Sequence, residues 1–417
     1  MSDSSIPKFH EKTREEKLKA LESFSNLSKD DIQILKSAGG INFEQANNMV
    51  ENAIGIVSYP LGIATNFKIN DKDYLIPMVI EEPSVIAAAS KAAKIARKHG
   101  GFTMEADESY SVGQVQVVNV DVKSAISNVM EKSKEILVMA NSKSKTLSQM
   151  GKGAKEVSCK ELITESGSML IVEILIDVGD AMGANVTNTM CEAIAPLIEK
   201  ITGGRVILKI LSNYSTKRLV KGKAVFDKEE LGGEDIVNNI ILAYQFAAND
   251  PYRAVTHNKG IMNGIIAVAN STGQDTRAIE AAAHAYASRY GSYTSLTKWK
   301  KNKDGNLVGE IEIPMSVGIV GGIVNIHPMI KICVKILGVK SARELACIIG
   351  AAGLAQNLSA IRALASEGIQ KGHMKLHAQN IAASAGVPQE QMAHVINQMT
   401  EEGNISVTRA KEILENL

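Results

Sequence analysis

A strand, a turn of small residues and a long helix follow one another within residues 168–204, and this stretch most constrains the fold. The strand is the apolar run 168–177, and the turn reads Asp-Ala-Met-Gly-Ala-Asn over residues 180–185. Apolar residues then recur at helical spacing until a Gly-Gly pair ends the helix. Helix N–H groups and the positive dipole end converge over Gly183, where a phosphate or nicotinamide group can bind. The GxGxxG fingerprint is absent, so an ordinary strand-to-helix turn also fits.

The alternation of strands and helices continues on both sides of this turn. The pattern predicts the order βαββαβ, which is the ferredoxin-like split βαβ arrangement. We therefore expect an α+β fold, in which a helix-rich large domain carries an inserted nucleotide-binding domain at residues 110–214. The predicted elements are strand 112–120, helix 122–140, strands at about 157–163 and 169–178, the helix after Asn185, and strand 205–211.

The large substrate-binding domain is expected in two parts, residues 1–109 and 215–367. The first part contains short amphipathic helices, a strand-like segment ending near Val79 and an Ala-rich helix over 85–98. After Asn213 the chain reads as mainly helical again, with helices at 276–290 and from 341 to about 367. Only 4% of residues are aromatic, so we expect the core to form by close approach of small-residue helices rather than from large rings. Residues 368–417 are expected to form a mobile C-terminal helical flap.

Composition excludes several classes of protein. Lys plus Arg is 46 and Asp plus Glu is 45, so no general attraction to nucleic acid or to an anionic membrane is expected. The sequence has no evident signal peptide or membrane span, and we expect a cytoplasmic protein. Its four cysteines lack metal-site spacing and fit reduced thiols better than disulfides.

Three charged positions are candidates for chemistry. Lys259 lies next to a glycine and an apolar run, where a partly desolvated ammonium could stabilise an oxyanion, although a solvated surface lysine is the commoner case. Asp275 reads first as a helix N-cap. Glu81 and Glu82 precede Pro83 and read first as charges in the first turn of a helix, although one of them could instead be a general acid with a raised pKa.

His373 and His377 are four residues apart, which is the spacing of paired metal ligands on a helix. No third ligand cluster accompanies them, so we expect no metal. A single histidine in this segment instead suits proton delivery near neutral pH. From residue chemistry alone, the sequence predicts a soluble enzyme with an embedded nucleotide-binding domain and leaves the substrate open.

Several long motifs, in order along nearly the whole chain, resemble those of 3-hydroxy-3-methylglutaryl-coenzyme A (HMG-CoA) reductases, specifically the soluble class II form. The segments that carry the resemblance are residues 51–55 (ENAIG), 81–85 (EEPSV), 180–185 (DAMGAN), 257–263 (HNKGIMN), 273–275 (GQD), 353–357 (GLAQN) and 372–374 (GHM).

The resemblance implies two successive hydride transfers from NAD(P)H, which convert HMG-CoA to mevalonate and coenzyme A. Lys259 would stabilise the oxyanion of both the hemithioacetal and the aldehyde stage, Asp275 would tune this lysine, and Glu82 would supply a proton. His373 would protonate the departing coenzyme A thiolate. These roles agree with general chemistry, because hydride addition to a carbonyl builds negative charge on oxygen.

The resemblance also implies binding residues and an assembly. The expected substrate contacts are Ser84, Arg253, Asn263 and Asn357, and the expected nicotinamide contacts are Asp180, Met182, Gly183, Asn185 and Asn213. The motif at 51–55 matches a dimer contact, so a homodimer with interfacial active sites, or a higher oligomer, is expected.

Cofactor choice is predicted from the segment that follows the first helix of the inserted domain. Some relatives carry an acidic residue there, whereas this chain has Ser144 between Lys143 and Lys145. A hydroxyl between two ammonium groups can accept a 2′-phosphate, so we expect NADPH in preference to NADH.

Two other classes of protein stay open as alternative functions: a metal-dependent acyl-CoA lyase and a non-catalytic nucleotide sensor. The sequence does not decide whether the cell makes or breaks down mevalonate.

Overall fold

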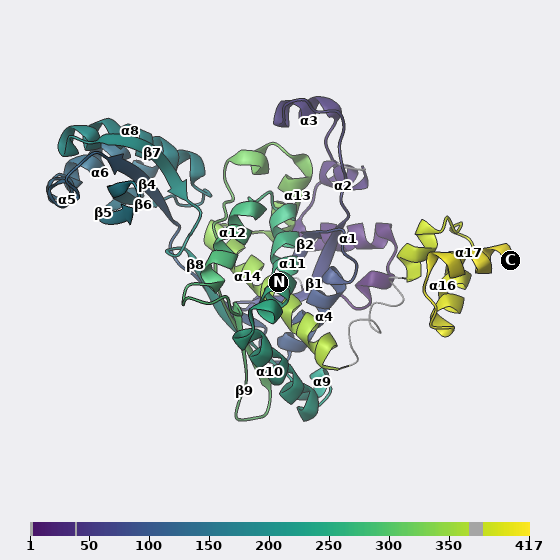
Figure 1. Ribbon diagram of the computed structural model, residues 1–417. Coiled ribbons are helices and arrows are strands. Elements are labelled where there is room, and N and C mark those ends of the chain that lie inside the picture. Colours follow the sequence, from purple (N-terminus) through teal and green to yellow (C-terminus); the bar gives the residue numbers. More distant parts are fainter. Residues whose placement is uncertain (1–2, 38–39, 367–377) are drawn as a thin grey trace.

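The computed structural model describes residues 3–37, 40–366 and 378–417. A large domain lies in the middle of the molecule, a smaller domain with its own sheet projects from one side, and the C-terminal helices lie on the other side (Figure 1).

The large domain is built on a six-stranded sheet in the order β2-β1-β3-β8-β10-β9. β1 and β3 pair in parallel, and the other neighbours are antiparallel. The chain beyond Asn213 is mainly helical, as the sequence suggested, but it also supplies three of these strands, which the sequence analysis did not predict. In these strands lysines and glutamates that face solvent alternate with apolar residues. The segments therefore lack the continuous apolar run that marks a strand buried on both faces. The strands are β1 (Leu61–Ile69), β2 (Lys72–Val79), β3 (Phe102–Ala106), β8 (Leu219–Phe226), β9 (Thr297–Lys301) and β10 (Leu307–Pro314).

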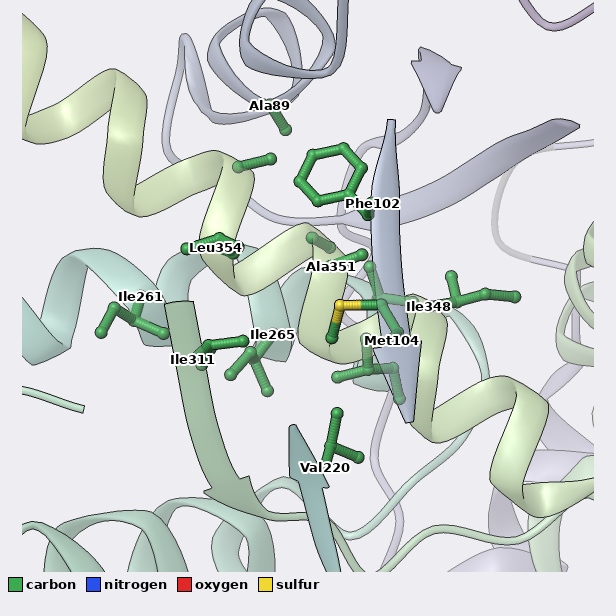
Figure 2. Packing of buried hydrophobic residues seen from close by; sticks show 14 of the residues in the cluster. Ala89, Phe102, Met104, Val220, Ile261, Ile265, Ile311, Ile348, Ala351 and Leu354 are labelled. Atoms are coloured by element: carbon green, nitrogen blue, oxygen red, sulfur yellow. The ribbon is translucent and has the colours of Figure 1, made fainter. Parts of the chain in front are cut away.

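Three helices pack against this sheet and form the core: α4 (Val85–Arg97), α11 (Pro251–Ser271) and α14 (Ala342–Ala365). Small residues allow α11 and α14 to approach closely. A Cβ added at Gly264 would lie 2.6 Å from the carbonyl oxygen of Ala352, and one added at Gly353 would lie 2.8 Å from a side-chain carbon of Ile265. Figure 2 shows the resulting packing of α11, α14 and β3 side chains. The expected close helix approach is confirmed.

Large rings contribute to the core as well. The rings of Phe67 and Phe102 stack with centroids 5.5 Å apart, and Phe226 touches both Phe102 and Trp299, with centroids 6.2 and 5.8 Å away. Four of the few aromatic residues thus form one continuous row along the sheet. The expectation that large rings would not build the core was therefore wrong, because the few aromatic residues are concentrated on one sheet.

Among the described helices, only α14 is long and apolar enough to cross a membrane. Most of its apolar stretch, 83%, is buried inside the protein. Its hydropathy therefore fits a central core helix, packed against α4, α11 and the sheet.

The smaller domain has the strand order β5-β6-β4-β7, with all neighbours antiparallel. Together with the element order along the chain, this is the predicted βαββαβ arrangement. One detail differs, because the predicted helix over 122–140 is two helices that meet at Lys132. The elements are β4 (Tyr110–Val118), α5 (Val122–Glu131), α6 (Ser133–Asn141), α7 (Lys145–Gln149), β5 (Gly153–Thr164), β6 (Gly167–Asp177), α8 (Ala184–Thr202) and β7 (Arg205–Ser212).

The remaining elements surround the large domain or follow it. Residues 378–384 are helical and form a separate small apolar cluster with the last two helices. The others are η1 (Phe9–Glu11), α1 (Arg14–Ser25), α2 (Lys29–Lys36), α3 (Phe43–Met49), α9 (Lys228–Leu231), α10 (Glu234–Asn249), α12 (Thr276–Ala287), η2 (Gly322–Asn325), α13 (Pro328–Leu337), α16 (Met392–Glu401) and α17 (Val407–Glu415).

Candidate active site

Glu82, Lys259 and Asn263 form a hydrogen-bonded cluster on the exposed side of α11. The Lys259 ammonium donates to Glu82 Oε2 at 2.7 Å, and the Asn263 amide donates to the same oxygen at 3.2 Å. Lys259 and Asn263 are neighbours because residues four apart share one face of a helix. The Lys259 side chain is 59% exposed and that of Glu82 is 38% exposed, so a substrate can reach both. A cation beside a carboxyl group can bind a carbonyl oxygen and move a proton to it.

The loop that carries Glu82 distinguishes it from its neighbour. Glu81 is exposed, whereas Glu82 is partly buried and contacts Lys259. Ser84 follows with a left-handed backbone, at φ 73°, and begins α4. Its hydroxyl is buried and has no hydrogen-bond partner among the described residues. A strained backbone and an unpaired polar group on one residue are typical of a ligand site.

Arg253 and His257 lie one helical turn apart, at the start of α11. Partial burial lowers the pKa of Arg253, and its guanidinium makes no ion pair within the described part of the chain. Burial, and secondarily the charge of Arg253, lower the pKa of His257 to about 3. His257 is therefore neutral at physiological pH, and Arg253 is a cation available to a carboxylate. Sequence reasoning gave His257 no role, although it lies in the 257–263 motif.

Asn357 is only 1% exposed and takes part in an internal hydrogen-bond network. Its Oδ1 accepts hydrogen bonds from Thr297 Oγ1 and from Trp299 Nε1, both at 2.9 Å. Thr297 Oγ1 also lies 2.9 Å from His257 Nε2. The structure thus connects Asn357 to α11 through β9, rather than directly to the Glu82 cluster.

The turn at residues 180–185 lies between β6 and the first residues of α8, as the sequence predicted. Gly183 precedes α8 with φ 107°, and no side chain caps this helix end. A Cβ at Gly183 would lie 2.7 Å from a Val178 methyl carbon, so glycine is required on both steric and backbone grounds. The first N–H groups of α8 are therefore available to an anion or a polar ligand.

Arg218 holds this turn in place and was not found from the sequence. It is 4% exposed, and its guanidinium donates to the carbonyl oxygens of Ala181, Met182 and Val317. Burial lowers its pKa to about 10, so it stays charged. No motif surrounds Arg218, and only the tertiary structure shows that its partners are backbone carbonyls.

The other residues expected on the cofactor side lie around this turn or in the smaller domain. Asp180 is partly buried and accepts a hydrogen bond from Ala342 N at the start of α14. Ser144 caps α7 through Leu147 N and is partly exposed. Asn185 and Asn213 are exposed, and Met182 is partly exposed.

Asp275 precedes α12, near the turn at residues 180–185, and makes no hydrogen bond or ion pair with Lys259 in the described part of the chain. Its carboxylate caps α12 through Ala278 N and pairs with Arg277 at 3.0 Å. The adjacent Gln274 exchanges two hydrogen bonds with the backbone of Gly318, and the next residue, Ile319, donates to the Asp180 carbonyl.

Lys259 and Asp275 are far apart because α11 separates them. Twelve residues of α11 follow Lys259 before the helix ends at Ser271, which corresponds to about 18 Å of helix at 1.5 Å per residue. One chain therefore places the Lys259 cluster near the middle of α11 and Asp275 beyond the C-terminal end of this helix.

His373 and His377 lie outside the described residues, so the structure does not place the expected proton donor. Among the residues that it does describe, no group of three His, Cys, Asp or Glu side chains could hold a metal ion.

Comparisons with known proteins give one consistent result. The family model described as hydroxymethylglutaryl-coenzyme A reductase matches residues 13–378. The chain is 51% identical to the 3-hydroxy-3-methylglutaryl-coenzyme A reductase of Archaeoglobus fulgidus over 99% of this chain and 95% of that protein. It is 39% identical to a probable enzyme of the same name from Borreliella burgdorferi, over 89% and 85% of the two chains.

Solved structures of the reductase from Streptococcus pneumoniae are also similar. One matches with a TM-score of 0.84 and 38% identity over 99% of both chains. A second, described as a class II reductase bound to NADPH in open conformations, matches with a TM-score of 0.83 and 39% identity, over 87% of this chain and all of that one.

Proposed function

The chain belongs to the hydroxymethylglutaryl-coenzyme A reductase family, and on this premise we propose how its residues carry out the reaction. The enzyme is an oxidoreductase that reduces a coenzyme A thioester, 3-hydroxy-3-methylglutaryl-CoA, to mevalonate in two hydride transfers. The contact that carries the proposal is the 2.7 Å hydrogen bond between Lys259 and Glu82.

Lys259 and Glu82 act on the carbonyl oxygen that gains negative charge in each reduction. The Lys259 ammonium stabilises the oxyanion of the hemithioacetal and of the aldehyde stage. Glu82 then supplies the proton, and the hydrogen bond from Asn263 fixes its carboxyl group. His373 protonates the coenzyme A thiolate that leaves after the first reduction.

Arg253 and Ser84 are proposed to bind the carboxylate end of the substrate. The guanidinium of Arg253 has no ion pair among the described residues, and the Ser84 hydroxyl is buried without a partner. Asn263 is proposed to contact the substrate directly, and Asn357 to support the substrate side through its hydrogen bonds to β9. These unpaired groups support the proposal, because buried polar groups are normally hydrogen-bonded.

NADPH is the proposed cofactor, as in the solved pneumococcal relative. The uncapped N-terminus of α8 fits the polar part of a nicotinamide group, and Asp180, Met182, Gly183, Asn185 and Asn213 are proposed to surround it. Bound NADPH supplies the hydride for each reduction. Ser144, between two exposed lysines, is proposed to accept the 2′-phosphate.

We further propose that the working enzyme is a homodimer with active sites at the subunit interface. Within one chain the oxyanion half-site lies near the middle of α11 and the cofactor half-site lies beyond its C-terminal end, yet hydride transfer needs reacting atoms in contact. A second copy that places its Asp275 and cofactor turn against Lys259 would complete each site.

An exposed apolar segment beside the 51–55 motif supports this assembly. Ile54 is 99% exposed, Val57 is 84% exposed and Tyr59 is 57% exposed. Such a continuous apolar run on a soluble domain marks an interface.

We also propose a role for each domain and a location for the enzyme in the cell. Residues 1–109 and 215–367 would form the substrate domain, residues 110–214 the cofactor domain, and residues 368–417 a flap that closes during turnover. The enzyme is proposed to act in the cytoplasm, in either direction between HMG-CoA and mevalonate.

The stoichiometry of cofactor oxidation tests the function. With HMG-CoA as substrate, absorbance of the reduced nicotinamide should fall by two equivalents for each thioester consumed, and one coenzyme A should be released. A lyase would release coenzyme A derivatives without cofactor oxidation and would require a divalent metal. A sensor would bind the cofactor and oxidise none of it.

A further inference from the structure

Gln356 and Asn357 are consecutive residues of α14, and their side-chain amide oxygens differ in whether they accept hydrogen bonds. Asn357 Oδ1 accepts two hydrogen bonds, from Thr297 and Trp299. Gln356 is 6% exposed, and its Oε1 is buried without a partner among the described residues. A buried acceptor without a donor costs stability, so its presence needs a reason.

Gln356 faces the part of α11 that carries the Lys259 cluster. A Cβ added at Gly264 would lie 2.8 Å from Gln356 Cβ, and one added at Gly260 would lie 3.6 Å from Ala360 Cβ. Gly260 and Gly264 directly follow Lys259 and Asn263 in the chain. The Gln356 side chain therefore starts at the level of the catalytic turn, on the neighbouring helix.

The start of α4 carries a second unpartnered group beside the same turn of α14. Ser359 Oγ donates to the Ala88 carbonyl at 2.7 Å, and Ala88 N donates to the Ser84 carbonyl at 2.8 Å. These bonds link the first turn of α4, where the Ser84 hydroxyl lacks a partner, to the α14 turn of Gln356. The buried acceptor of Gln356 and the buried hydroxyl of Ser84, neither with a partner among the described residues, thus lie on two helices that pack against each other and against α11.

Resting on the proposed reductase function, we propose that Gln356 is the α14 amide that binds the acyl substrate, through its tertiary hydroxyl group. Gln356 Oε1 is an acceptor that lacks a donor, and the 3-hydroxyl is a donor on the part of the substrate next to the reacting carbonyl. Asn357 is then a positioning residue, because its own oxygen is already occupied by β9. Gln356 thereby distinguishes a 3-hydroxy acyl group from one without the hydroxyl.

The variant Gln356→Met tests this assignment, because methionine keeps the unbranched shape and removes the acceptor. We expect KM for HMG-CoA to rise about tenfold with kcat within about threefold, since the contact forms equally in the ground and transition states. KM for NADPH should not change. Thermal stability without substrate should be equal or higher, because an unpaired buried acceptor is lost.

A substrate analogue identifies the group that Gln356 binds. In the wild-type enzyme, 3-methylglutaryl-CoA, which lacks only the hydroxyl, should bind about tenfold more weakly than HMG-CoA. In Gln356→Met the two should bind alike. An unchanged ratio would overturn the hydroxyl contact, and an unchanged KM or a lower stability would overturn a substrate role for Gln356.

Asn357→Ala provides the matched comparison on the next residue. It removes the acceptor that Thr297 Oγ1 and Trp299 Nε1 share, so the unfolding temperature should fall. Trp299 is the single tryptophan of the chain, and its fluorescence should shift in Asn357→Ala but not in Gln356→Met. If Asn357→Ala lost substrate binding and left the Trp299 fluorescence unchanged, Asn357 would be the substrate contact and the roles proposed for Gln356 and Asn357 would be rejected. If the wild-type enzyme oxidised no NADPH with HMG-CoA, the proposed function itself would fail, independently of Gln356.

Discussion

Glu82 Oε2 accepts a 2.7 Å hydrogen bond from the Lys259 ammonium, although 177 residues separate the two in sequence. The contact joins the loop after β2 to the exposed face of α11. It places an acid and a cation where one carbonyl oxygen could meet both, and the first two predictions follow from it.

Lys259→Ala should abolish both reductions and leave the fold intact. The side chain is 59% exposed, so its removal costs little packing, while loss of one oxyanion partner typically lowers the rate about 10²-fold or more. Turnover with HMG-CoA and with mevaldehyde should be measured beside Lys303→Ala, an exposed lysine in a distant hairpin, as control. Near-normal turnover of Lys259→Ala would show that Lys259 does not stabilise the oxyanion.

Glu82→Gln should bind substrate but not reduce it, whereas Glu81→Gln should remain active. Only Glu82 contacts Lys259 and Asn263, and Glu81 faces solvent. Measuring turnover and substrate binding of the two single variants decides which glutamate supplies the proton. If the Glu81 variant is the inactive one, the motif has been assigned with an error of one residue.

Asp275→Asn should be nearly as inactive as Lys259→Ala, yet a mixture of the two variants should recover activity. If Lys259 and Asp275 of different subunits meet in one site, equal mixing, unfolding and refolding gives about a quarter of wild-type activity, because half of the dimers are mixed and each of these has one intact site. Each variant refolded alone is the control. No recovery, despite proven mixed dimers, would place the complete site within one chain.

His373→Gln should cripple reduction of the thioester and spare reduction of free mevaldehyde. Only the thioester route expels a thiolate, which needs an acid. A chain truncated at Gly368 should behave likewise. Equal loss with both substrates would mean that His373 organises the site instead of protonating coenzyme A.

Cofactor preference should depend on Ser144. The wild-type enzyme should prefer NADPH, and Ser144→Asp should shift the ratio of kcat/KM toward NADH, because a carboxylate repels the 2′-phosphate. Lys155→Ala, whose ammonium binds the Gly151 carbonyl, is a control for a general change in charge. A wild-type preference for NADH of about tenfold, roughly 1.4 kcal/mol, would reject the role of Ser144.

The sequence by itself determined the features that depend on short stretches of chain. The βαββαβ order, the turn at Gly183 and the family motifs follow from hydrophobic period, glycine placement and residue order, and all are local. Residue chemistry also indicated Lys259 and the pair Glu81 and Glu82 as candidates, and the resemblance chose Glu82 without any knowledge of distance.

Only the tertiary structure decided which of these residues meet. It brought Lys259 to Glu82, separated Lys259 from Asp275 by the rest of α11, and revealed Arg218 as the support of the Gly183 turn. It also gave Asn357 internal partners and left Gln356 without one. The reason is physical: hydrogen-bond satisfaction and burial depend on side chains from distant segments, which the packing of α4, α11 and α14 on one sheet brings together and no local pattern records.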